Sequence, residues 1–307
     1  MKRRKRPSFL AVVLILCVIV IVLVRNAMGG ELGLRGDPLV SFPVVKWGFN
    51  RNQAMKARNL IIVAGHSIVK DGDLKGAVFD DDKWYLLDYQ QAADMPEAFS
   101  NHIKSGINIA LEDPEALLVF SGGQTRPEAG PKSEALSYFQ VADKYGWWSE
   151  EAHQEVRTCE SVLNLFFLLS KVRHRTVLEE FALDSFQNLL FSICRFREIT
   201  GAYPARISVV SFSFKRERFE GLHRAAIRFP PSAFMYHSSD PDSIKFLKQL
   251  PVLAEWESKA SVKPFKDDPY GCNSGVLRRK RLERDVYIRT PAYSTTCPEI
   301  SELLSYW

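Results

Sequence analysis

The pattern of apolar and polar positions divides the chain into a very hydrophobic N-terminal run and a longer part in which strand-like and helix-like segments alternate. Four short apolar runs predict strands, at residues 59–64 (NLIIVA), 116–120 (ALLVF), 206–211 (RISVVS) and 233–236. Apolar residues at helical spacing lie between or after these runs, at residues 96–111, 133–145, 185–200 and 215–227. Strands separated by helices of this length predict parallel βαβ units. We therefore expect a three-layer, doubly wound, Rossmann-like α/β domain with a mostly parallel sheet over about residues 59–262.

The first 25 residues have the pattern of a membrane segment preceded by a basic end. Residues 2–6 read KRRKR, and residues 9–24 contain no polar side chain other than Cys17. At ~1.5 Å per residue, a helix over residues 9–24 is about 24 Å long, which suits the thinner membranes of the early secretory pathway. We expect a single-pass signal-anchor transmembrane helix over residues 9–25. A cleaved signal peptide is the open alternative, although Arg25 directly after the apolar run is unfavourable for a cleavage site.

This segment also sets the expected location of the chain. Positive charge before the apolar run keeps residues 1–8 as a basic cytosolic end. Residues 26–307 would then face the lumen of the endoplasmic reticulum or Golgi, and the membrane would be a partner of the chain through residues 9–25. Residues 26–58 contain several glycines and two prolines without a clean period, and they predict a stem.

Net charge argues against nucleic acid as a partner. The chain has 41 basic and 36 acidic residues, which gives +5, but six of the basic residues and no acid fall within residues 1–25. The remainder has 35 basic against 36 acidic residues, a balance of −1. A nearly neutral folded part lacks the basic surface that phosphate backbones require.

Cysteine positions leave the thiol chemistry open. Outside the apolar run the cysteines are Cys159, Cys194, Cys272 and Cys297, which allow three pairings in an oxidising lumen. We expect Cys272 and Cys297 to pair because both lie in a loop-rich region. Free, partly buried thiols are the alternative. No Cys/His cluster has zinc-ligand spacing, so we predict no metal site.

Two segments fit the α/β pattern poorly. Residues 157–175 place an apolar patch between basic ends, and we interpret them as an insertion, either a genuine one or a retained intron in the gene model. Residues 263–307 are rich in prolines and glycines before Cys297 and predict a C-terminal tail that wraps the domain. Within this tail, residues 278–284 (RRKRLER) resemble a nuclear-localisation signal, but we interpret them as a solvated face.

Polar and flexible residues follow three of the predicted strands. In open α/β sheets, ligands bind beyond the carboxyl ends of the strands. The residues at these ends are Gly65 and His66, then Ser121, Gly122, Gly123 and Arg126, then Lys215 and Arg218. Adjacent glycines let backbone N–H groups turn toward an anion, and an arginine can bind phosphate through two hydrogen bonds. The pattern predicts a pocket for an anionic or phosphorylated ligand, with His66 as either an acid–base group or a structural histidine.

Two other polar groups open helices. Ser133 and Glu134 begin the helix at residues 133–145, and Glu179, Glu180, Asp184, Ser185 and Asn188 precede or enter the helix at residues 185–200. Helix capping by Ser133, Asp184 or Ser185 explains both groups without a ligand. Contact with a ligand is the alternative.

The order of these motifs resembles the domain-of-unknown-function family 218, the SanA/YdcF/ElyC-like proteins. The similar segments are residues 63–67 (VAGHS), 117–126 (LLVFSGGQTR), 133–139 (SEALSYF), 178–198 and 207–229. The segments DPYGC (268–272) and CPEI (297–300) are similar to the eukaryotic branch of plants and fungi. The resemblance implies a Rossmann-like fold and, for bacterial members, roles in envelope integrity, but no settled reaction.

The resemblance also implies a set of site residues. The implied catalytic residues are Glu134, Glu179 and Asp184. The ligand-binding residues, from the strand ends and the resemblance together, are Gly65, His66, Ser121, Gly122, Gly123, Arg126, Ser133, Ser185, Asn188, Lys215 and Arg218. Where bacterial members tend to have a histidine before the last arginine, this chain has Lys215, so a general-base histidine is lost there.

Three functions fit these observations. The first is a lumenal domain that binds a phosphorylated or nucleotide-like ligand, as an enzyme of glycan or lipid-carrier metabolism. The second is a non-catalytic, membrane-associated binding or assembly factor. The third is an S-adenosylmethionine-binding protein, against which the missing glycine-rich loop after the first strand counts. The sequence decides neither whether the protein is an enzyme nor which cofactor or protein partner it uses.

Overall fold

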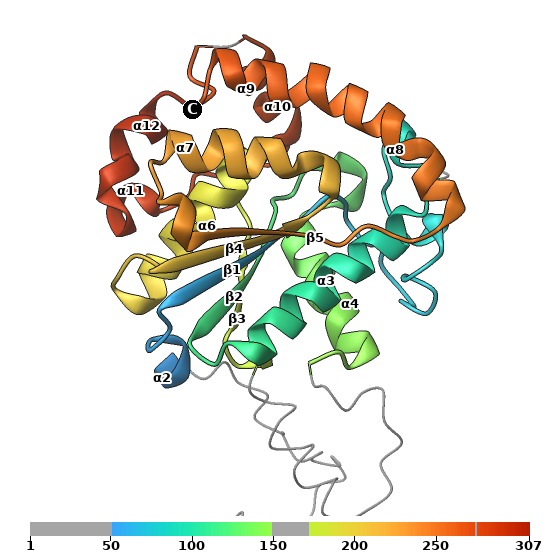
Figure 1. Cartoon of the computed structure of the whole chain (residues 1–307), viewed down its shortest axis with the longest axis horizontal. Helices are drawn as coiled ribbons and strands as arrows, with labels where there is room; N and C mark the ends of the chain where they lie inside the picture. The colour runs from blue at the N-terminus through green and yellow to red at the C-terminus, as the bar shows by residue number, and fades with distance from the viewer. Residues whose placement is uncertain (1–50, 92, 149–171, 274) are drawn as a thin grey trace, which may run out of the picture. The chain divides into compact units, whose positions relative to one another are not determined.

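The computed structural model describes residues 51–91, 93–148, 172–273 and 275–307. Its centre is a five-stranded sheet in the order β3-β2-β1-β4-β5, with every neighbouring pair parallel (Figure 1). The strands are β1 (Asn59–Ala64), β2 (Ala116–Ser121), β3 (Thr176–Glu179), β4 (Arg206–Ser211) and β5 (Phe234–Ser238). The predicted α/β class with a parallel sheet is confirmed, and β3 is a strand that the apolar pattern did not predict.

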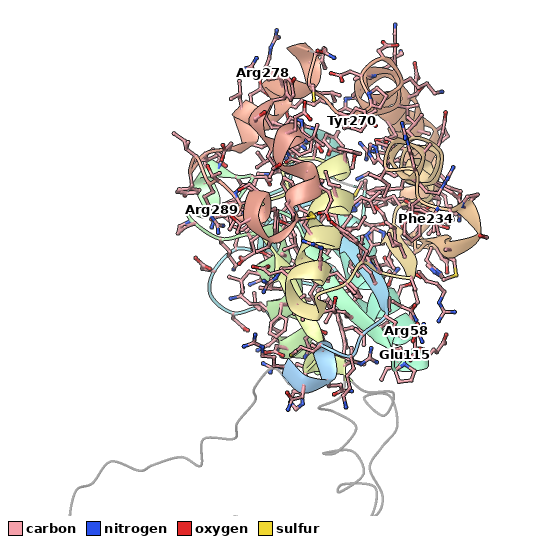
Figure 2. The ribbon with its side chains drawn as sticks, turned by 90° about the vertical axis from the view of Figure 1, so that its left-hand side faces the viewer. Arg58, Glu115, Phe234, Tyr270, Arg278 and Arg289 are labelled. Atoms are coloured by element: carbon pink, nitrogen blue, oxygen red, sulfur yellow. A yellow bond between two sulfur atoms is a disulfide. The ribbon has the colours of Figure 1, made fainter. Side chains whose placement is uncertain are left out.

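The strand order creates a switch point at β1. The chain moves from β1 outward through β2 to β3, and then returns to the other side of β1 with β4 and β5. The amino ends of β1 and β2 meet where the amide of Arg58 donates to the carbonyl of Glu115 at 2.8 Å, and Tyr270 and Arg278 lie toward the opposite end (Figure 2). At such a point the connections leave the carboxyl ends of β1 and β4 in opposite directions, which opens a crevice between them.

One face of the sheet is covered by α3 (Met95–Glu112) and α4 (Glu134–Tyr145) (Figure 1). Phe99, Ile103 and Tyr138 from these helices pack against strand residues in one buried apolar cluster. A Cβ at Gly106 would lie 2.2 Å from Cγ2 of Val63, so only glycine allows α3 to approach β1 this closely.

The opposite face is covered by α6 (Ser185–Thr200) and by a π-helical segment, Glu217–His223, that continues as α7 (Arg224–Ala226). The short helix α2 (Arg51–Ala54) contributes buried Ala54 to the same cluster. Because both faces are covered, β1 and β2 are buried along their full length, which explains their uninterrupted apolar runs.

The C-terminal part is largely helical. It contains α8 (Ile244–Glu257), a π-helical segment (Ser258–Val262), α9 (Lys263–Asp267), α10 (Gly275–Arg284), α11 (Tyr293–Thr296) and α12 (Ser301–Ser305). Short 3₁₀ turns elsewhere in the chain and near its end occupy Asp81–Lys83, Asp88–Gln90, Pro127–Ala129, Ser213–Lys215, Pro231–Ala233 and Pro298–Ile300.

A third apolar cluster joins α6 to the C-terminal part of the chain, with Phe186 and Phe191 buried beside Phe265, Leu277 and Tyr293.

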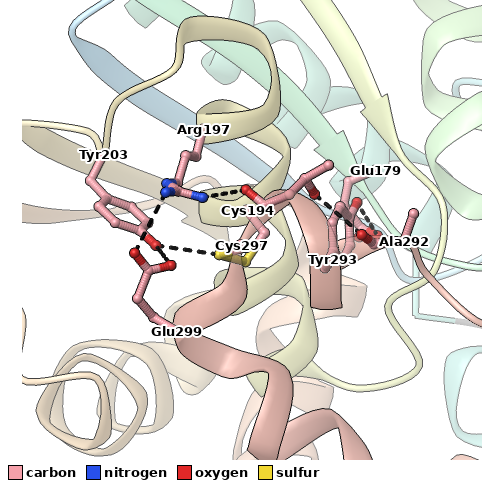
Figure 3. Close-up of a disulfide and its surroundings, with 9 residues drawn as sticks. Glu179, Cys194, Arg197, Tyr203, Ala292, Tyr293, Cys297 and Glu299 are labelled. Carbon is pink, nitrogen blue, oxygen red and sulfur yellow. Dashed lines mark hydrogen bonds and ion pairs between the residues drawn. A yellow bond between two sulfur atoms is a disulfide. The ribbon is translucent and has the colours of Figure 1, made fainter.

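A disulfide also links α6 to the C-terminal part of the chain. Cys194 of α6 is bonded to Cys297, 103 residues later, with a Cα–Cα distance of 5.3 Å (Figure 3). The expected pair Cys272–Cys297 is therefore wrong, and Cys272 is a free thiol. The physical reason is that Cys194 lies on the face of α6 that packs against the C-terminal part of the chain. Cys194 is therefore the nearer partner of Cys297.

The predicted membrane helix at residues 9–25, its basic end and most of the stem lie outside the described residues, as does most of the segment 157–175. Within the described ranges, no helix is long and apolar enough to cross a membrane. Val172 and Arg175, at the end of the segment 157–175, are buried.

Candidate functional site

A small cavity lies beyond the carboxyl ends of β1, β2 and β4, at the switch point of the sheet. Its volume is ≈ 80 Å³, and we call it the strand-end cavity. Nine of the predicted site residues line it: Gly65, His66, Arg126, Glu134, Asp184, Ser185, Asn188, Lys215 and Arg218. Arg126 and Lys215, which follow different strands, thus reach the same cavity.

The other predicted residues lie behind the cavity wall. Ser121 donates to Oε2 of Glu179 at 2.7 Å, and Nδ2 of Asn188 donates to the carbonyl and the hydroxyl of Ser121 at 2.9 Å each. Burial raises the pKa of Glu179 to about 7, although the Ser121 hydroxyl and the Phe181 amide oppose the shift. These contacts connect β2, β3 and α6 directly beneath the cavity.

The glycine turn after β2 positions the start of α4. The amide of Gly123 donates to the carbonyl of Ala182 at 2.8 Å, and the amide of Glu134 donates to the carbonyl of Gly123 at 3.0 Å. Ser133 is the N-cap of α4: it accepts from the amide of Leu136 at 2.9 Å and donates to Glu180 at 2.7 Å. Ser133 thus has the capping role that the sequence left open.

Glu134 faces the cavity in a close-fitting position. The Thr125 hydroxyl donates to its Oε1 at 2.5 Å. A Cβ at Gly65 would lie 2.7 Å from the Cβ of Glu134, and one at Gly122 would lie 2.6 Å from its Oε2. Two glycines therefore make room for this carboxylate, and a larger residue at either position would displace it.

A lysine, a histidine and a serine form a chain of polar contacts from the cavity into the sheet. Nζ of Lys215 lies 3.1 Å from Nδ1 of His66, and Nε2 of His66 lies 3.0 Å from the Ser211 hydroxyl. Burial and, next, the charge of Lys215 lower the pKa of His66 well below its ordinary value, so this imidazole is neutral. When Lys215 is charged it donates to Nδ1, and Nε2 then carries the proton and donates to Ser211.

Lys215 is the residue of this group that titrates near neutral pH. Burial, followed by the charge of Arg218, lowers its pKa to about 7. A lysine with such a pKa can both donate and accept a proton at physiological pH. Lys215 therefore has acid–base capacity at physiological pH.

The C-terminal part supplies one side of the cavity, which the sequence did not predict. Trp256, Glu257, Lys280 and Arg284 all line it. Burial and then the charge of Arg284 lower the pKa of Lys280 to about 8. The only signal for Lys280 and Arg284 is the spacing of Leu277, Arg281 and Arg284, which places one face of a helix toward the domain.

The interpretation of residues 278–284 as a solvated face is wrong for one side of α10. Arg278 and Arg279 are exposed, but Arg281 is buried and donates through Nε to Oδ2 of Asp184 at 2.6 Å. Asp184 is the N-cap of α6 and accepts from the amide of Gln187 at 2.9 Å. Burial alone would raise the pKa of Asp184, but Arg281 and the Gln187 amide outweigh it and lower the pKa.

Positive charge exceeds negative charge in the cavity. Arg218 is paired with Glu257 at 3.0 Å, and Asp184 is paired with Arg281. Among the described residues, no carboxylate forms an ion pair with the four other cationic side chains that line the cavity, which are Arg126, Lys215, Lys280 and Arg284. The remaining carboxylate of the cavity is Glu134. The arrangement can therefore stabilise a compact anion and has an acid–base group beside it.

Ser185 has a neighbour that the sequence did not indicate. Its hydroxyl lies 2.7 Å from Nε2 of His223, and the His223 ring is surrounded by Phe186, Phe219 and Phe265. Burial, and then the charge of Arg218, lower the pKa of His223 well below its ordinary value. A histidine that resists protonation is a poor general base, so this contact orients the Ser185 hydroxyl at the cavity wall.

No cluster of three or more His, Cys, Asp or Glu side chains suited to a metal ion occurs in the part of the chain that the structure describes. The site is thus defined by cationic side chains, a carboxylate and a lysine at the carboxyl ends of a parallel sheet.

These features define an α/β protein with a cationic cavity at the switch point of its sheet. The chain is 31% identical over 234 residues to the uncharacterized protein YOR238W of Saccharomyces cerevisiae, an alignment that covers 69% of this chain and 76% of the yeast protein. The chain therefore belongs to the same family as this yeast protein. No family model matches the chain, and no solved structure matches it significantly.

Proposed function

We propose that the strand-end cavity binds the phosphate group of a small phosphorylated or nucleotide-like molecule. The observation that carries this proposal is the convergence of three cationic side chains without carboxylate ion pairs, Arg126, Lys280 and Arg284, from two separate segments of the described chain. Charge-assisted hydrogen bonds to phosphate are stronger than neutral ones, and arginine matches phosphate geometry. A cavity of ≈ 80 Å³ suits a compact anionic group, with the rest of the ligand extending through the opening.

We further propose that the protein is an enzyme, in glycan or lipid-carrier metabolism. Lys215 and Glu134 would be its acid–base groups, and Asp184 would hold the cavity wall through Arg281. A non-catalytic binding factor on the same scaffold is the second candidate, and it would need the phosphate contacts but not Lys215 or Glu134. An S-adenosylmethionine-binding protein is less favoured, since an excess of positive charge in the cavity repels a sulfonium cation.

The cellular setting belongs to the proposal as well. The basic end followed by the apolar run supports a signal anchor at residues 9–25, with the α/β domain in the lumen of the endoplasmic reticulum or Golgi. The disulfide Cys194–Cys297 is of the kind that persists in oxidising compartments, which also supports a lumenal location. The proposal that the chain is a member of family 218 rests on the order of its sequence motifs.

The test is titration of the full chain with inorganic phosphate and pyrophosphate, with binding measured by calorimetry and by thermal unfolding. Arg284→Ala and Arg126→Ala should each weaken binding, because each removes charge-assisted hydrogen bonds worth ~1.5–3 kcal/mol, or about 10- to 150-fold in affinity. Arg279→Ala is the matched control, since Arg279 is exposed on the same helix as Arg284. Equal affinities in the Arg279 and Arg284 variants, or no binding to the wild-type chain, would refute the proposal.

A further inference from the structure

The amine of Lys215 has an unusual environment for a lysine. No carboxylate of the described residues forms an ion pair with it. Its Nζ lies 5.0 Å from the centre of the Phe212 ring and 5.7 Å from that of Phe214, and its hydrogen-bond partner is His66. Aromatic rings stabilise an ammonium group only weakly compared with water or a carboxylate. This position therefore favours the neutral, nucleophilic form of the amine.

The residues beneath the amine strengthen this preference. His66 is fixed by Ser211, and the His102 ring lies edge-on to it at 5.4 Å between ring centres. His102 is fully buried, and neither of its ring nitrogens has a hydrogen-bond partner among the described residues. A cavity floor of neutral rings holds no negative charge that would keep Lys215 protonated.

The cavity also brings this amine together with groups that a carbonyl reaction requires. Glu134, which forms no ion pair among the described residues, lines the same cavity. Its charge and that of Glu257 raise the pKa of Lys215, but burial and the charge of Arg218 outweigh them. Arg126, Lys280 and Arg284 line it as well and supply positive charge for a phosphate. An uncharged lysine beside other cationic groups is a recognised arrangement for nucleophilic attack on carbonyl carbon.

We propose that Lys215 forms an imine with the aldehyde or ketone group of a phosphorylated substrate in the strand-end cavity. This inference rests on the proposed function, because the arginines and Lys280 that bind the phosphate would place the carbonyl carbon next to the amine. It assigns the substrate class, a phosphorylated carbonyl compound, and gives Lys215 the role of nucleophile.

The step balances with the groups present. The nitrogen lone pair of neutral Lys215 forms a bond to the carbonyl carbon, and the C=O π electrons move to oxygen. Glu134 accepts a proton from the nitrogen and returns it to the oxygen, which gives a carbinolamine. Loss of the hydroxyl with a second nitrogen proton releases one water and leaves a C=N bond, with Glu134 again unprotonated.

The test uses glycolaldehyde phosphate as the probe and borohydride to reduce any imine to a stable secondary amine. The full chain is incubated with the probe at pH 7, reduced, digested and mapped by mass spectrometry. At pH 7 a lysine with a pKa of about 7 has roughly a 1000-fold larger neutral fraction than an ordinary lysine near 10.4. We expect labelling of Lys215 to exceed that of exposed Lys75 by at least about tenfold, because only the neutral amine reacts with the probe.

Three further measurements decide the outcome. Inorganic phosphate should protect Lys215 from the probe, unphosphorylated glycolaldehyde should label it much less, and Lys215→Arg should carry no adduct at this position. Phosphate binding to the wild-type chain without a Lys215 adduct would overturn the imine while leaving the proposed function intact. Labelling of Lys215 and Lys75 to the same extent, unaffected by phosphate, would also overturn it. Peptide mapping of the wild-type chain gives the answer even if the Lys215 variant does not fold.

Discussion

Arg281 and Asp184 form a buried ion pair that connects α10 to the first turn of α6. The guanidinium Nε lies 2.6 Å from Oδ2, and the side chains are 6% and 7% exposed. Asp184 also caps α6, next to Ser185 at the cavity wall. One residue from the C-terminal part therefore holds the helix that bears part of the site.

The first prediction concerns this pair. Arg281→Met should lower the free energy of unfolding by about 3–5 kcal/mol, because it leaves the Asp184 carboxylate buried without its partner. The exposed Arg278→Met on the same helix is the control and should change stability by less than about 0.5 kcal/mol. Urea denaturation measures both. A loss of the same size in the two variants would show that the pair has no special role.

The second prediction is a pH dependence from Glu179. Its pKa is about 7 in the folded protein, mainly because of burial, against an ordinary value of 4.5. At this carboxyl the folded state therefore binds more protons than the unfolded state between pH 4.5 and pH 7, so the contribution of Glu179 to stability falls as pH rises through this window. The full difference is about 3 kcal/mol at ~1.36 kcal/mol per pKa unit. The lowered pKa values of His66, His223 and Lys215 contribute to the pH dependence with the opposite sign.

Denaturation at pH 5 and pH 8 tests this effect. The stability of Glu179→Gln relative to the wild type should be higher at pH 8 than at pH 5 by about 2–3 kcal/mol, because the amide does not titrate. Glu115→Gln, a change at an exposed residue, should leave the difference as it is in the wild type. The same stability difference between the Glu179 variant and the wild type at both pH values would contradict the raised pKa of Glu179.

The third prediction concerns the room that glycine gives to Glu134. Gly65→Ala would place a methyl carbon 2.7 Å from the Glu134 Cβ and 3.0 Å from the Ser121 carbonyl oxygen. We expect a stability loss of about 1–3 kcal/mol from the overpacking, together with weaker phosphate binding because the cavity wall moves. Gly275→Ala is a suitable control, since a methyl group there would meet no atom of the described chain within 4 Å beyond its immediate neighbours. Calorimetric titration that finds unchanged affinity in Gly65→Ala would contradict the expected displacement.

The fourth prediction concerns the disulfide. Replacing Cys194 and Cys297 together by serine should lower the free energy of unfolding by about 2–5 kcal/mol, since the bond closes a long loop in the unfolded chain. Cys272→Ser should have little effect, because this thiol is free. Peptide mapping without reduction should find the peptides of Cys194 and Cys297 joined. Recovery of a Cys272–Cys297 peptide instead would refute the pairing.

The sequence predicts the strands that are buried on both faces and misses the one that is short. β1, β2 and β4 each have six residues with a nearly continuous apolar run. β3 has four residues, and its Thr176 and Glu179 interrupt the pattern. Such a strand is specified by its pairing with β2 and not by its own composition.

The sequence predicts cavity residues that follow a strand, such as Arg126, or that open a helix, such as Glu134 and Asp184. Arg126 and Lys215 could be assigned to one cavity because parallel strands end at the same edge. Lys280 and Arg284 could not be assigned to it, since their position depends on the contact between Arg281 and Asp184, 97 residues apart.

Arg126 also has a structural role that the sequence does not indicate. From the sequence it has only a ligand-binding role, whereas in the structure it is 8% exposed and donates to the carbonyl and hydroxyl of Thr125. Arg126→Ala should therefore also reduce stability.

The 103-residue separation of the disulfide has a consequence for how the protein is made. At about 5–20 residues per second, synthesis delivers Cys297 roughly 5–20 seconds after Cys194. During this interval β4 and β5 are added to the sheet, and Lys280, Arg284 and the partner cysteine follow them. A nascent chain thus exposes an unfinished cavity and a free Cys194 thiol until residues 275–307 emerge. Emergence of residues 275–307 is therefore the event that supplies the partner cysteine of the disulfide and adds Lys280 and Arg284 to the cavity.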